Sequence, residues 1–402
     1  MPIKRKYLNN SPHPERFVAL VLQGGGALGA YHLGAVQALD EAGYVPDWIT
    51  GVSIGSVNGA ILAGNPPETR VQRLQQFWER VTDPPLWDVI AHMWDPFIPG
   101  NLRRLASMGN AMQSLIFGQP HFSRPNLINP YLARPGTAAA TSFFDNSPLR
   151  RTLEDFVDLD YLNNDQPRLS LGVTLVRTGD VLYFDTDNPD HRPFTLDHVI
   201  ASTAIPPLFA GVRINGDLYW DGGIVDNTPL DPVLDEQDAH PERNALVFMI
   251  DLWGQSERDP ETLDEVLWRT NQIEFASRTD RQIKTMLEKQ NLKRTLHDLA
   301  EQASPAVLSR INTLAEATNY TYGNLDIVRI TYRPDDSQSA LSYMDFSHSS
   351  ITRRIADGYA DMQAALDKSP WLVPPSHAAG ISPRATLHEV ERGQIHTKVP
   401  EV

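Results

Sequence analysis

Two glycine-rich motifs near the start of this 402-residue chain have the residue types of an acyl-transfer site. Residues Gly51–Gly55 read GVSIG, the G-x-S-x-G form that places Ser53 on a sharp strand-to-helix turn with its hydroxyl exposed. Residues Gly24–Gly29 read GGGALG, a loop whose backbone N–H groups can donate to a developing negative charge. The pair predicts a serine acyl hydrolase, whereas the simpler interpretation of Ser53 is an ordinary helix N-cap.

The glycine loop also has the spacing of a dinucleotide-binding fingerprint, because Gly24, Gly26 and Gly29 stand as G-x-G-x-x-G between a predicted strand and helix. That fingerprint needs an acidic residue at the end of the second strand, where this chain has Gly51–Ser53. A Walker A loop is excluded, since no Gly-Lys-Ser/Thr follows. The remaining interpretation is an anion site at a helix N-terminus, which in a hydrolase binds the tetrahedral oxyanion.

A serine nucleophile needs a base, and the sequence offers two kinds. Histidine is the usual partner, but four candidate histidines have no distinctive local context: His191, His198, His297 and His348. Asp221 instead ends an apolar strand, Leu218–Trp220, and precedes Gly222 and Gly223. A carboxylate there can be exposed at a strand end with neighbours that allow close approach, although Asp-Gly-Gly by itself is often only a turn.

The elements that must position these residues alternate between strands and helices. Apolar runs predict strands over 16–23 and 47–52, and amphipathic or small-residue patterns predict helices over 30–42 and 54–63. This alternation implies parallel strand pairing and an α/β core. Later patterns predict helices at 69–81, from Ser147 and at 195–202, hairpins at 169–185 and 212–220, and a buried strand at 244–252.

The expected catalytic domain spans 16–255, between a disordered lead at 1–15 and other regions of distinct composition. Residues 83–144 are rich in Pro, Trp, Met and Phe with short helical patterns at best, which predicts an insertion. It is either a hydrophobic cluster under long loops or a cap that shapes an apolar substrate pocket. A mostly helical extension is expected over 256–369, including a strand at 325–332 and a helix at 350–368, followed by a flexible tail at 370–402.

The bulk composition excludes several classes of protein. A net charge of −15 argues against nucleic acid as a partner, and the lack of cysteine excludes disulfides and thiolate chemistry. No apolar run approaches a membrane span and no signal peptide follows the basic start, so we expect a cytoplasmic protein with at most weak peripheral membrane contact through Lys4–Lys6. No metal or other cofactor is expected, because no ligand motif occurs.

In their order along the chain, these motifs resemble the patatin-like phospholipases. The resemblance rests on Gly24–Gly29, Gly51–Gly55 and Asp221–Gly223, with Ala201–Pro206 and Asn227–Pro229 similar to the family's flanks of the aspartate motif. It implies a three-layer α/β/α sandwich with a mainly parallel central sheet and a Ser–Asp dyad without histidine. The family's pattern then has Ser53 attack an ester carbonyl, Asp221 take and return the proton, and the N–H groups of Gly25 and Gly26 stabilise the oxyanion.

One residue departs from the family pattern, since Leu28 stands where many members have Arg or Lys. A basic residue there favours anionic head groups, so phospholipid is left open as the substrate. The sequence predicts cleavage of lipid carboxylic esters through an acyl-enzyme; a thioesterase, a polyester-oligomer hydrolase and an acyltransferase use the same dyad and stay as alternatives. A non-catalytic scaffold whose C-terminal helices bind a partner is the alternative from another class. The region from 256 resembles extensions of unknown role in bacterial members, and the oligomeric state is left open.

Overall fold

The structure, a computed structural model, describes residues 16–82, 100–164, 167–254, 259–276, 279–309, 323–334, 339–372 and 385–398. Within these residues a ten-stranded sheet has the order β12-β11-β10-β9-β1-β2-β5-β8-β7, with β6 paired to β5. Its strands are β1 (Phe17–Leu22), β2 (Trp48–Gly51), β5 (Arg168–Leu175), β6 (Val181–Asp185), β7 (Val212–Ile214), β8 (Asp217–Asp221), β9 (Ala245–Asp251), β10 (Leu325–Thr331), β11 (Ala385–Glu391) and β12 (Gln394–Lys398).

The sheet is mainly parallel. Strands β11, β10, β9, β1, β2 and β5 pair in parallel, and antiparallel pairs lie toward the two ends of the sheet. β1 lies between β2 and β9, so that Leu22 is opposite Gly51 on one side and Ile250 on the other. The chain leaves β1 toward β2 in one half of the sheet and leaves the adjacent β9 toward β10 in the other. This creates a switch point, where α/β folds hold their ligands at the carboxyl ends of the strands.

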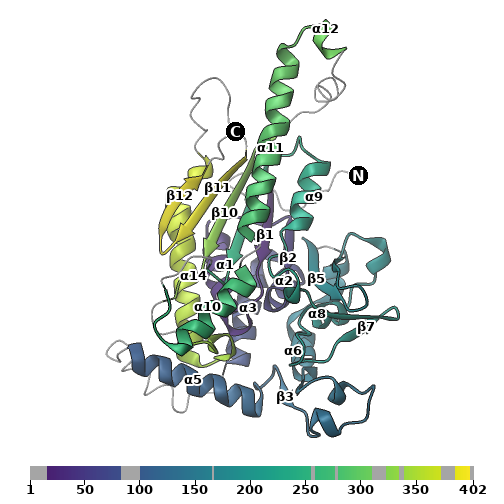
Figure 1. The fold of residues 1–402 in the computed structure, drawn as a ribbon, viewed down its shortest axis with the longest axis vertical. Helices are drawn as coiled ribbons and strands as arrows, with labels where there is room; N and C mark the ends of the chain where they lie inside the picture. The colour runs from purple at the N-terminus through teal and green to yellow at the C-terminus, as the bar shows by residue number, and fades with distance from the viewer. Residues whose placement is uncertain are drawn as a thin grey trace.

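Helices cover both faces of the sheet (Figure 1). Side chains of β1 alternate between two apolar clusters, as expected for a strand buried on both faces. Leu20 and its neighbours pack with α1 (Ala30–Glu41), α2 (Ile54–Ala63), α3 (Pro67–Val81) and α14 (His348–Lys368). Val21 and its neighbours pack with α9 (Asp231–Ala239) and α11 (Thr279–Gln302). The prediction of a three-layer α/β/α sandwich is confirmed.

The remaining described elements are short or lie at the rim. They are η1 (Gly26–Gly29), α5 (Gly100–Phe117), β3 (Arg124–Pro125), η3 (Pro130–Leu132), η4 (Ala138–Ala140), β4 (Phe144–Asp145), α6 (Ser147–Phe156), α7 (Leu159–Asn164), η5 (Pro189–His191), α8 (Leu196–Ser202), η6 (Gly222–Ile224), α10 (Leu263–Ala276), α12 (Pro305–Leu308), η7 (Ser342–Met344) and η8 (Pro370–Leu372).

The mostly helical region predicted over 256–369 contributes to the sandwich itself, through β10 in the sheet and α14 on one face. β10 pairs with β9, and α14 crosses α1 so closely that a Cβ at Gly34 would lie 1.8 Å from the Ile355 carbonyl oxygen. A Cβ at Gly358 would lie 2.1 Å from the Tyr31 carbonyl oxygen. Only glycine permits these contacts between helix backbones, so α14 is an integral part of the helical layer that contains α1 and α2.

The predicted flexible tail at 370–402 is wrong for Ala385–Lys398, which form β11 and β12 at the edge of the sheet. The insertion also differs from the prediction, because α5 has 18 residues where only short helical patterns were expected. Its small residues, Ser107, Ala111 and Ser114, face inward, so the helix lacks the usual apolar inner stripe. The predicted lead at 1–15 and the first part of the insertion, 83–99, lie outside the described residues.

Candidate active site

Ser53 lies on a strained turn between β2 and α2. Its φ of 54° and ψ of −124° belong to a region that side-chain-bearing residues rarely adopt. The turn is possible because its flanks are glycines: a Cβ at Gly51 would lie 2.4 Å from the Gly55 carbonyl oxygen, and one at Gly55 would lie 2.1 Å from that of Leu22. This is the nucleophile-elbow geometry that the G-x-S-x-G motif predicts.

The last residue of α8 holds the elbow from the other side. The Ser53 N–H donates to the Ser202 carbonyl oxygen at 3.0 Å. The Ser202 hydroxyl in turn donates to the Gly172 carbonyl at 2.6 Å and lies 2.6 Å from the Ser56 hydroxyl. Ser202 is therefore a positioning residue that ties the elbow to β5. Sequence reasoning noted its segment by family likeness and assigned it no role.

The glycine loop follows β1 and begins the short helix η1. Gly26 has φ of +55°, and a Cβ there would lie 2.4 Å from the Tyr343 carbonyl oxygen. The Gly24 carbonyl accepts hydrogen bonds from Asn227 Nδ2 at 3.0 Å and Trp253 Nε1 at 2.8 Å. Within the part of the chain that the structure describes, the N–H groups of Gly25 and Gly26 donate no hydrogen bond, so both are available to an anion.

Gln23 anchors the start of this loop, and sequence reasoning missed it. The side chain is fully buried. Its Oε1 accepts the N–H groups of Leu252 at 2.6 Å and Trp253 at 3.0 Å, and its Nε2 donates to the Thr228 hydroxyl at 2.8 Å. One amide thus connects the carboxyl ends of β1 and β9 to the segment after Asp221. A glutamine at the end of an apolar strand is the local signal, since a buried amide needs several partners.

Asp221 ends β8 and is buried beside the elbow. Its Oδ1 accepts the Gly223 N–H at 2.8 Å. Burial raises the pKa of Asp221 to about 7, against the opposing effects of a hydrogen bond with the Ser53 side chain and the one from Gly223. Oδ2 is buried with no further hydrogen bond of regular geometry among the described residues. The carboxyl group therefore titrates near neutral pH, which suits a general base.

The predicted site residues converge on one place. A Cβ at Gly24 would lie 3.1 Å from the Cβ of Ser53, so the glycine loop runs directly past the serine. A Cβ at Gly222 would lie 2.9 Å from Val52 Cγ2, which brings the aspartate turn against the residue before Ser53. Gly29 and Gly223 pack in the same region, against Ile54 and Asn227 respectively. Leu28, the residue that departs from the family pattern, is fully buried in the main core cluster.

The four candidate histidines have other partners, and in the described part of the chain none hydrogen-bonds Ser53. His191 Nδ1 accepts the Asp185 N–H at 3.0 Å. His198 caps α8, stacks on Phe194 and has its pKa lowered to about 4 by burial. His297 lies beside Glu301 on α11, and His348 begins α14.

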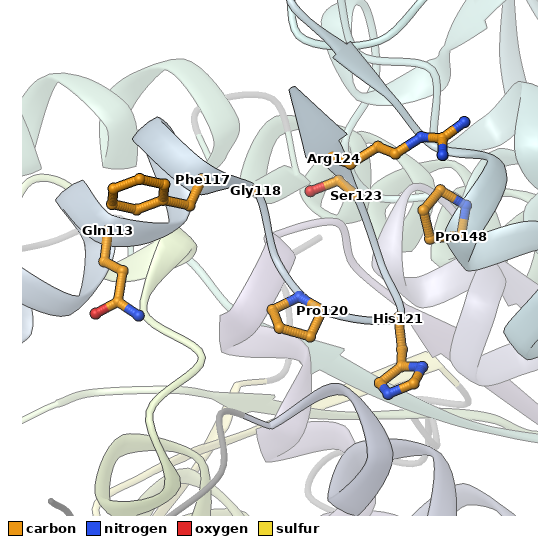
Figure 2. Close-up of a pocket in the computed structure, with 8 residues that line it drawn as sticks. All are labelled: Gln113, Phe117, Gly118, Pro120, His121, Ser123, Arg124 and Pro148. Atoms are coloured by element: carbon orange, nitrogen blue, oxygen red, sulfur yellow. The ribbon is translucent and has the colours of Figure 1, made fainter. Parts of the chain in front are cut away.

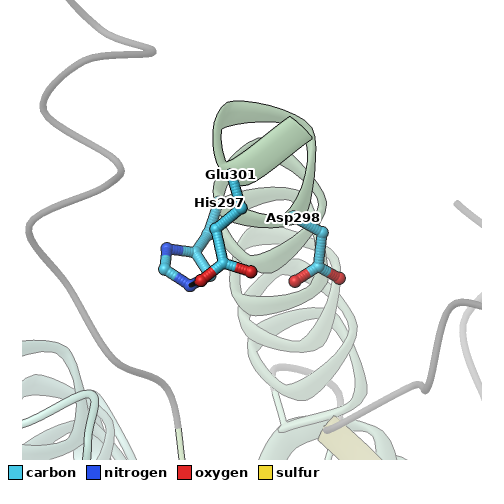
Figure 3. A group of neighbouring side chains, drawn as sticks. All are labelled: His297, Asp298 and Glu301. Atoms are coloured by element: carbon cyan, nitrogen blue, oxygen red, sulfur yellow. Dashed lines mark ion pairs between the residues drawn. The ribbon is translucent and has the colours of Figure 1, made fainter. Parts of the chain in front are cut away.

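Two further features lie apart from these residues. A cavity of about 470 Å³ separates the end of α5 from β3 and the start of α6, and none of the predicted site residues lines it (Figure 2). On α11, ligand atoms of His297, Asp298 and Glu301 lie within 4.8 Å of one another (Figure 3). An ordinary contact between side chains one helical turn apart explains this proximity, because His297 Nε2 is 3.5 Å from Glu301 Oε1.

The chain belongs to the patatin-like phospholipase family, whose model matches residues 20–234. A second family model, described as patatin phospholipase, matches residues 273–378, which run from α10 into the end of the described C-terminal helices. The family resemblance predicted from the motifs is thereby confirmed. The two matches together span both the serine elbow and the α14 region that supports the glycine loop.

Similar proteins match a short part of the chain. Patatin-like phospholipase domain-containing protein 6 of Homo sapiens is 43% identical over 63 residues, which are 16% of this chain and 5% of that protein. Neuropathy target esterase sws of Drosophila melanogaster is 41% identical over 63 residues, 16% of this chain and 4% of that protein. The chain thus spans about one twentieth of the length of these curated relatives.

Among solved structures, VipD from Legionella pneumophila is 17% identical with a TM-score of 0.38, over 88% of this chain and 67% of that one. Full-length ExoU from Pseudomonas aeruginosa, in complex with SpcU, is 16% identical with a TM-score of 0.23, over 92% and 72%. Among the helices described here, none combines the length and apolar character needed to cross a bilayer.

Proposed function

We propose that this protein is a serine acyl hydrolase that cleaves carboxylic esters of lipids with Ser53 as nucleophile and Asp221 as its base. One observation carries the proposal: a serine on a strained elbow adjoins a buried carboxyl group whose pKa is raised to about 7. Ser53 needs a base to become nucleophilic, and Asp221 is a buried titratable group close enough for the Ser53 side chain to oppose the rise in its pKa.

The reaction proceeds in two halves. Ser53 Oγ attacks the ester carbonyl carbon while its proton passes to Asp221, and a tetrahedral intermediate forms. The C–O bond to the alcohol then breaks, and Asp221 returns the proton to the leaving alkoxide, which leaves an acyl-enzyme on Ser53. In the second half Asp221 takes a proton from water, the hydroxide attacks the acyl carbon, and the bond to Ser53 Oγ breaks with return of the proton to Ser53.

Negative charge on the carbonyl oxygen is stabilised by the N–H groups of Gly25 and Gly26. Both lie at the N-terminal end of η1, and Gly24 runs past Ser53. The N-terminus of α2 begins directly after Ser53 and favours negative charge at the same place. Fixed donors of this kind typically contribute about 10²–10³ in kcat each.

A fluorophosphonate probe tests this proposal. Folded wild-type protein should be labelled at Ser53, and Ser53→Ala should abolish labelling while Ser304→Ala, an exposed serine at the start of α12, leaves it unchanged. Asp221→Asn should slow labelling by several orders of magnitude, with a residual rate from the oxyanion donors. No labelling of folded wild-type protein, or full labelling of Ser53→Ala, would show that the hydrolase assignment is wrong.

Substrate profiling separates lipid esters from the alternatives. Hydrolysis of long-chain lipid esters well above that of acyl thioesters and polyester oligomers supports the proposal. A product ester formed with an added alcohol, in place of free acid, identifies an acyltransferase that uses the same dyad.

A further inference from the structure

Between Leu105 and Phe117 the outward face of α5 is largely apolar and carries no charged side chain, which is unusual for a helix exposed to water. Its outward side chains include Leu105, Met112 and Ile116, which follow one another at spacings of seven and four and so form one stripe. Phe117 at the end of the helix is 71% exposed. Ser107, Ala111 and Ser114 face inward, so several of the large apolar side chains of α5 are left on its outward side.

The segment after α5 continues this character. Leu127, Ile128, Tyr131, Leu132 and Phe143 are all exposed, Leu132 to 83%. Nine of the nineteen large apolar side chains exposed in the described residues therefore lie between residues 105 and 143. Figure 1 shows α5 and β3 along one edge of the molecule, and the two elements are in contact. We call these nine residues, together with Arg104, Arg124 and Arg134, the apolar edge.

The apolar edge is cationic in a protein that is otherwise acidic. Residues 100–144 contain four arginines and no aspartate or glutamate, although the whole chain has a net charge of −15. Arg104 and Arg124 pair with acids outside the segment, Glu265 and Asp145. Arg134 is exposed and forms no ion pair with any described residue. Phe117 and Arg124 lie on opposite sides of the 470 Å³ cavity (Figure 2), so apolar and cationic groups share one hollow.

The apolar edge is also connected to the glycine loop. α5 packs against η7, and the Tyr343 carbonyl of η7 lies against Gly26. α5 is therefore linked through η7 to the glycine loop.

We propose that the apolar edge docks the protein on an anionic lipid bilayer. Exposed Leu, Ile, Met and Phe side chains enter the boundary between head groups and acyl chains, Tyr131 lies at that boundary, and Arg134 contacts lipid phosphates. The acidic remainder of the chain is repelled by the same membrane, which orients the molecule with this edge inward. The proposal concerns where the chain docks and does not depend on Ser53 being the nucleophile.

Charge disfavours a second copy of the chain as the occupant. A two-fold interface would place the same surface on both partners and would bring arginines against arginines across an apolar contact. An anionic bilayer instead matches both the apolar side chains and the positive charge.

Vesicle co-sedimentation tests the proposal with ether-linked lipids, which no esterase can cleave. The full chain should bind vesicles of phosphatidylcholine with phosphatidylglycerol more tightly than phosphatidylcholine alone, and added salt should weaken binding. Phe117→Ser with Leu132→Ser should weaken binding by more than about tenfold, and Arg134→Gln by about fivefold. Leu299→Ser and Arg177→Gln, at exposed positions outside the edge, should change it less than about twofold. Thermal unfolding midpoints check that each variant folds.

Failure to bind anionic vesicles, or equal binding by the edge variants and the controls, overturns the proposal. So does a wild-type dimer that Phe117→Ser with Leu132→Ser dissociates while vesicles remain unbound, because that result assigns the edge to a second copy. Binding that is indifferent to phosphatidylglycerol and to Arg134→Gln overturns the anionic-lipid assignment. If the protein binds vesicles as expected but does not hydrolyse a soluble short-chain ester, the docking inference is supported. The proposed hydrolase function is then the one that is wrong.

Discussion

Arg354 Nη1 on α14 donates a hydrogen bond to the Ala27 carbonyl oxygen of the glycine loop at 3.1 Å, across 327 positions of sequence. The same guanidinium donates to the Ser342 and Asp345 carbonyl oxygens, each at 2.8 Å. Arg354 is almost fully buried. It therefore joins η1 and η7, the two segments whose close contact at Gly26 shapes the anion-binding turn.

Replacing Arg354 should damage both stability and turnover. Arg354→Met leaves three carbonyl groups without their donor, and we expect a loss of about 3 kcal/mol in the free energy of unfolding together with a fall in kcat larger than any rise in KM. Arg354→Lys should recover part of both, since one ammonium cannot reach every carbonyl in the fork geometry. Arg177→Met, at an exposed arginine, is the matched control. Unchanged kcat in folded Arg354→Met would show that α14 does not support the loop.

The pH dependence of kcat/KM should follow Asp221. As a base it acts only when deprotonated, and its pKa is raised to about 7. The rate should therefore rise about tenfold per pH unit below neutrality and level off above pH 7. A soluble ester without ionisable groups makes the profile interpretable. A plateau that extends down to pH 5 would contradict Asp221 as the base.

Asp221→Asn should stabilise the fold at alkaline pH while it removes activity. The folded pKa is raised from 3.8 to about 7, so the folded state holds the proton more tightly than the unfolded state between these values. Wild-type stability consequently falls as pH rises from about 4 through 7, by an amount on the order of 4 kcal/mol for a fully buried group. Thermal unfolding at pH 5 and pH 8 measures this. A variant less stable than wild type at pH 8 would contradict the buried-charge explanation.

Gly26→Ala should disrupt the loop through both strain and collision. Its φ is positive, and the added Cβ would meet the Tyr343 carbonyl at 2.4 Å. Gly179→Ala is a control for strain alone, because φ there is +79° but no atom lies within 4 Å of an added Cβ. We expect about 1 kcal/mol of destabilisation in the control and clearly more at Gly26, with activity lost only in the latter. Equal effects in both variants would exclude the contact with Tyr343 as the cause.

The site residues that could be predicted are those with a local signature. Ser53 lies between two glycines and after an apolar run, and α2 has the predicted bounds Ile54–Ala63. Gln23 has only the weak signal of an amide at the end of an apolar strand, and Ser202 has none. Their roles are hydrogen bonds to Trp253 and Ser53, which are far away in sequence.

The contrast between local signals and contacts distant in sequence also explains which strands and helices could be predicted. Continuous apolar runs predict β1, β2 and β9, and these strands are buried on both faces. β11 and β12 have mixed, largely polar sequences, and they exist as strands because β10 offers an edge to pair with. The inward small residues of α5 likewise hide a helix from a search for apolar stripes. Contacts with the rest of the fold, and not the local sequence, determine the secondary structure of β11, β12 and α5.

The contact between Arg354 and Ala27 also has a consequence for synthesis of the protein. The glycine loop and Ser53 leave the ribosome before η7 and α14, which emerge some three hundred residues later. A nascent chain therefore carries Ser53 long before Arg354 can hold the loop beside it. We expect the ability to hydrolyse esters to appear only after α14 has been synthesised.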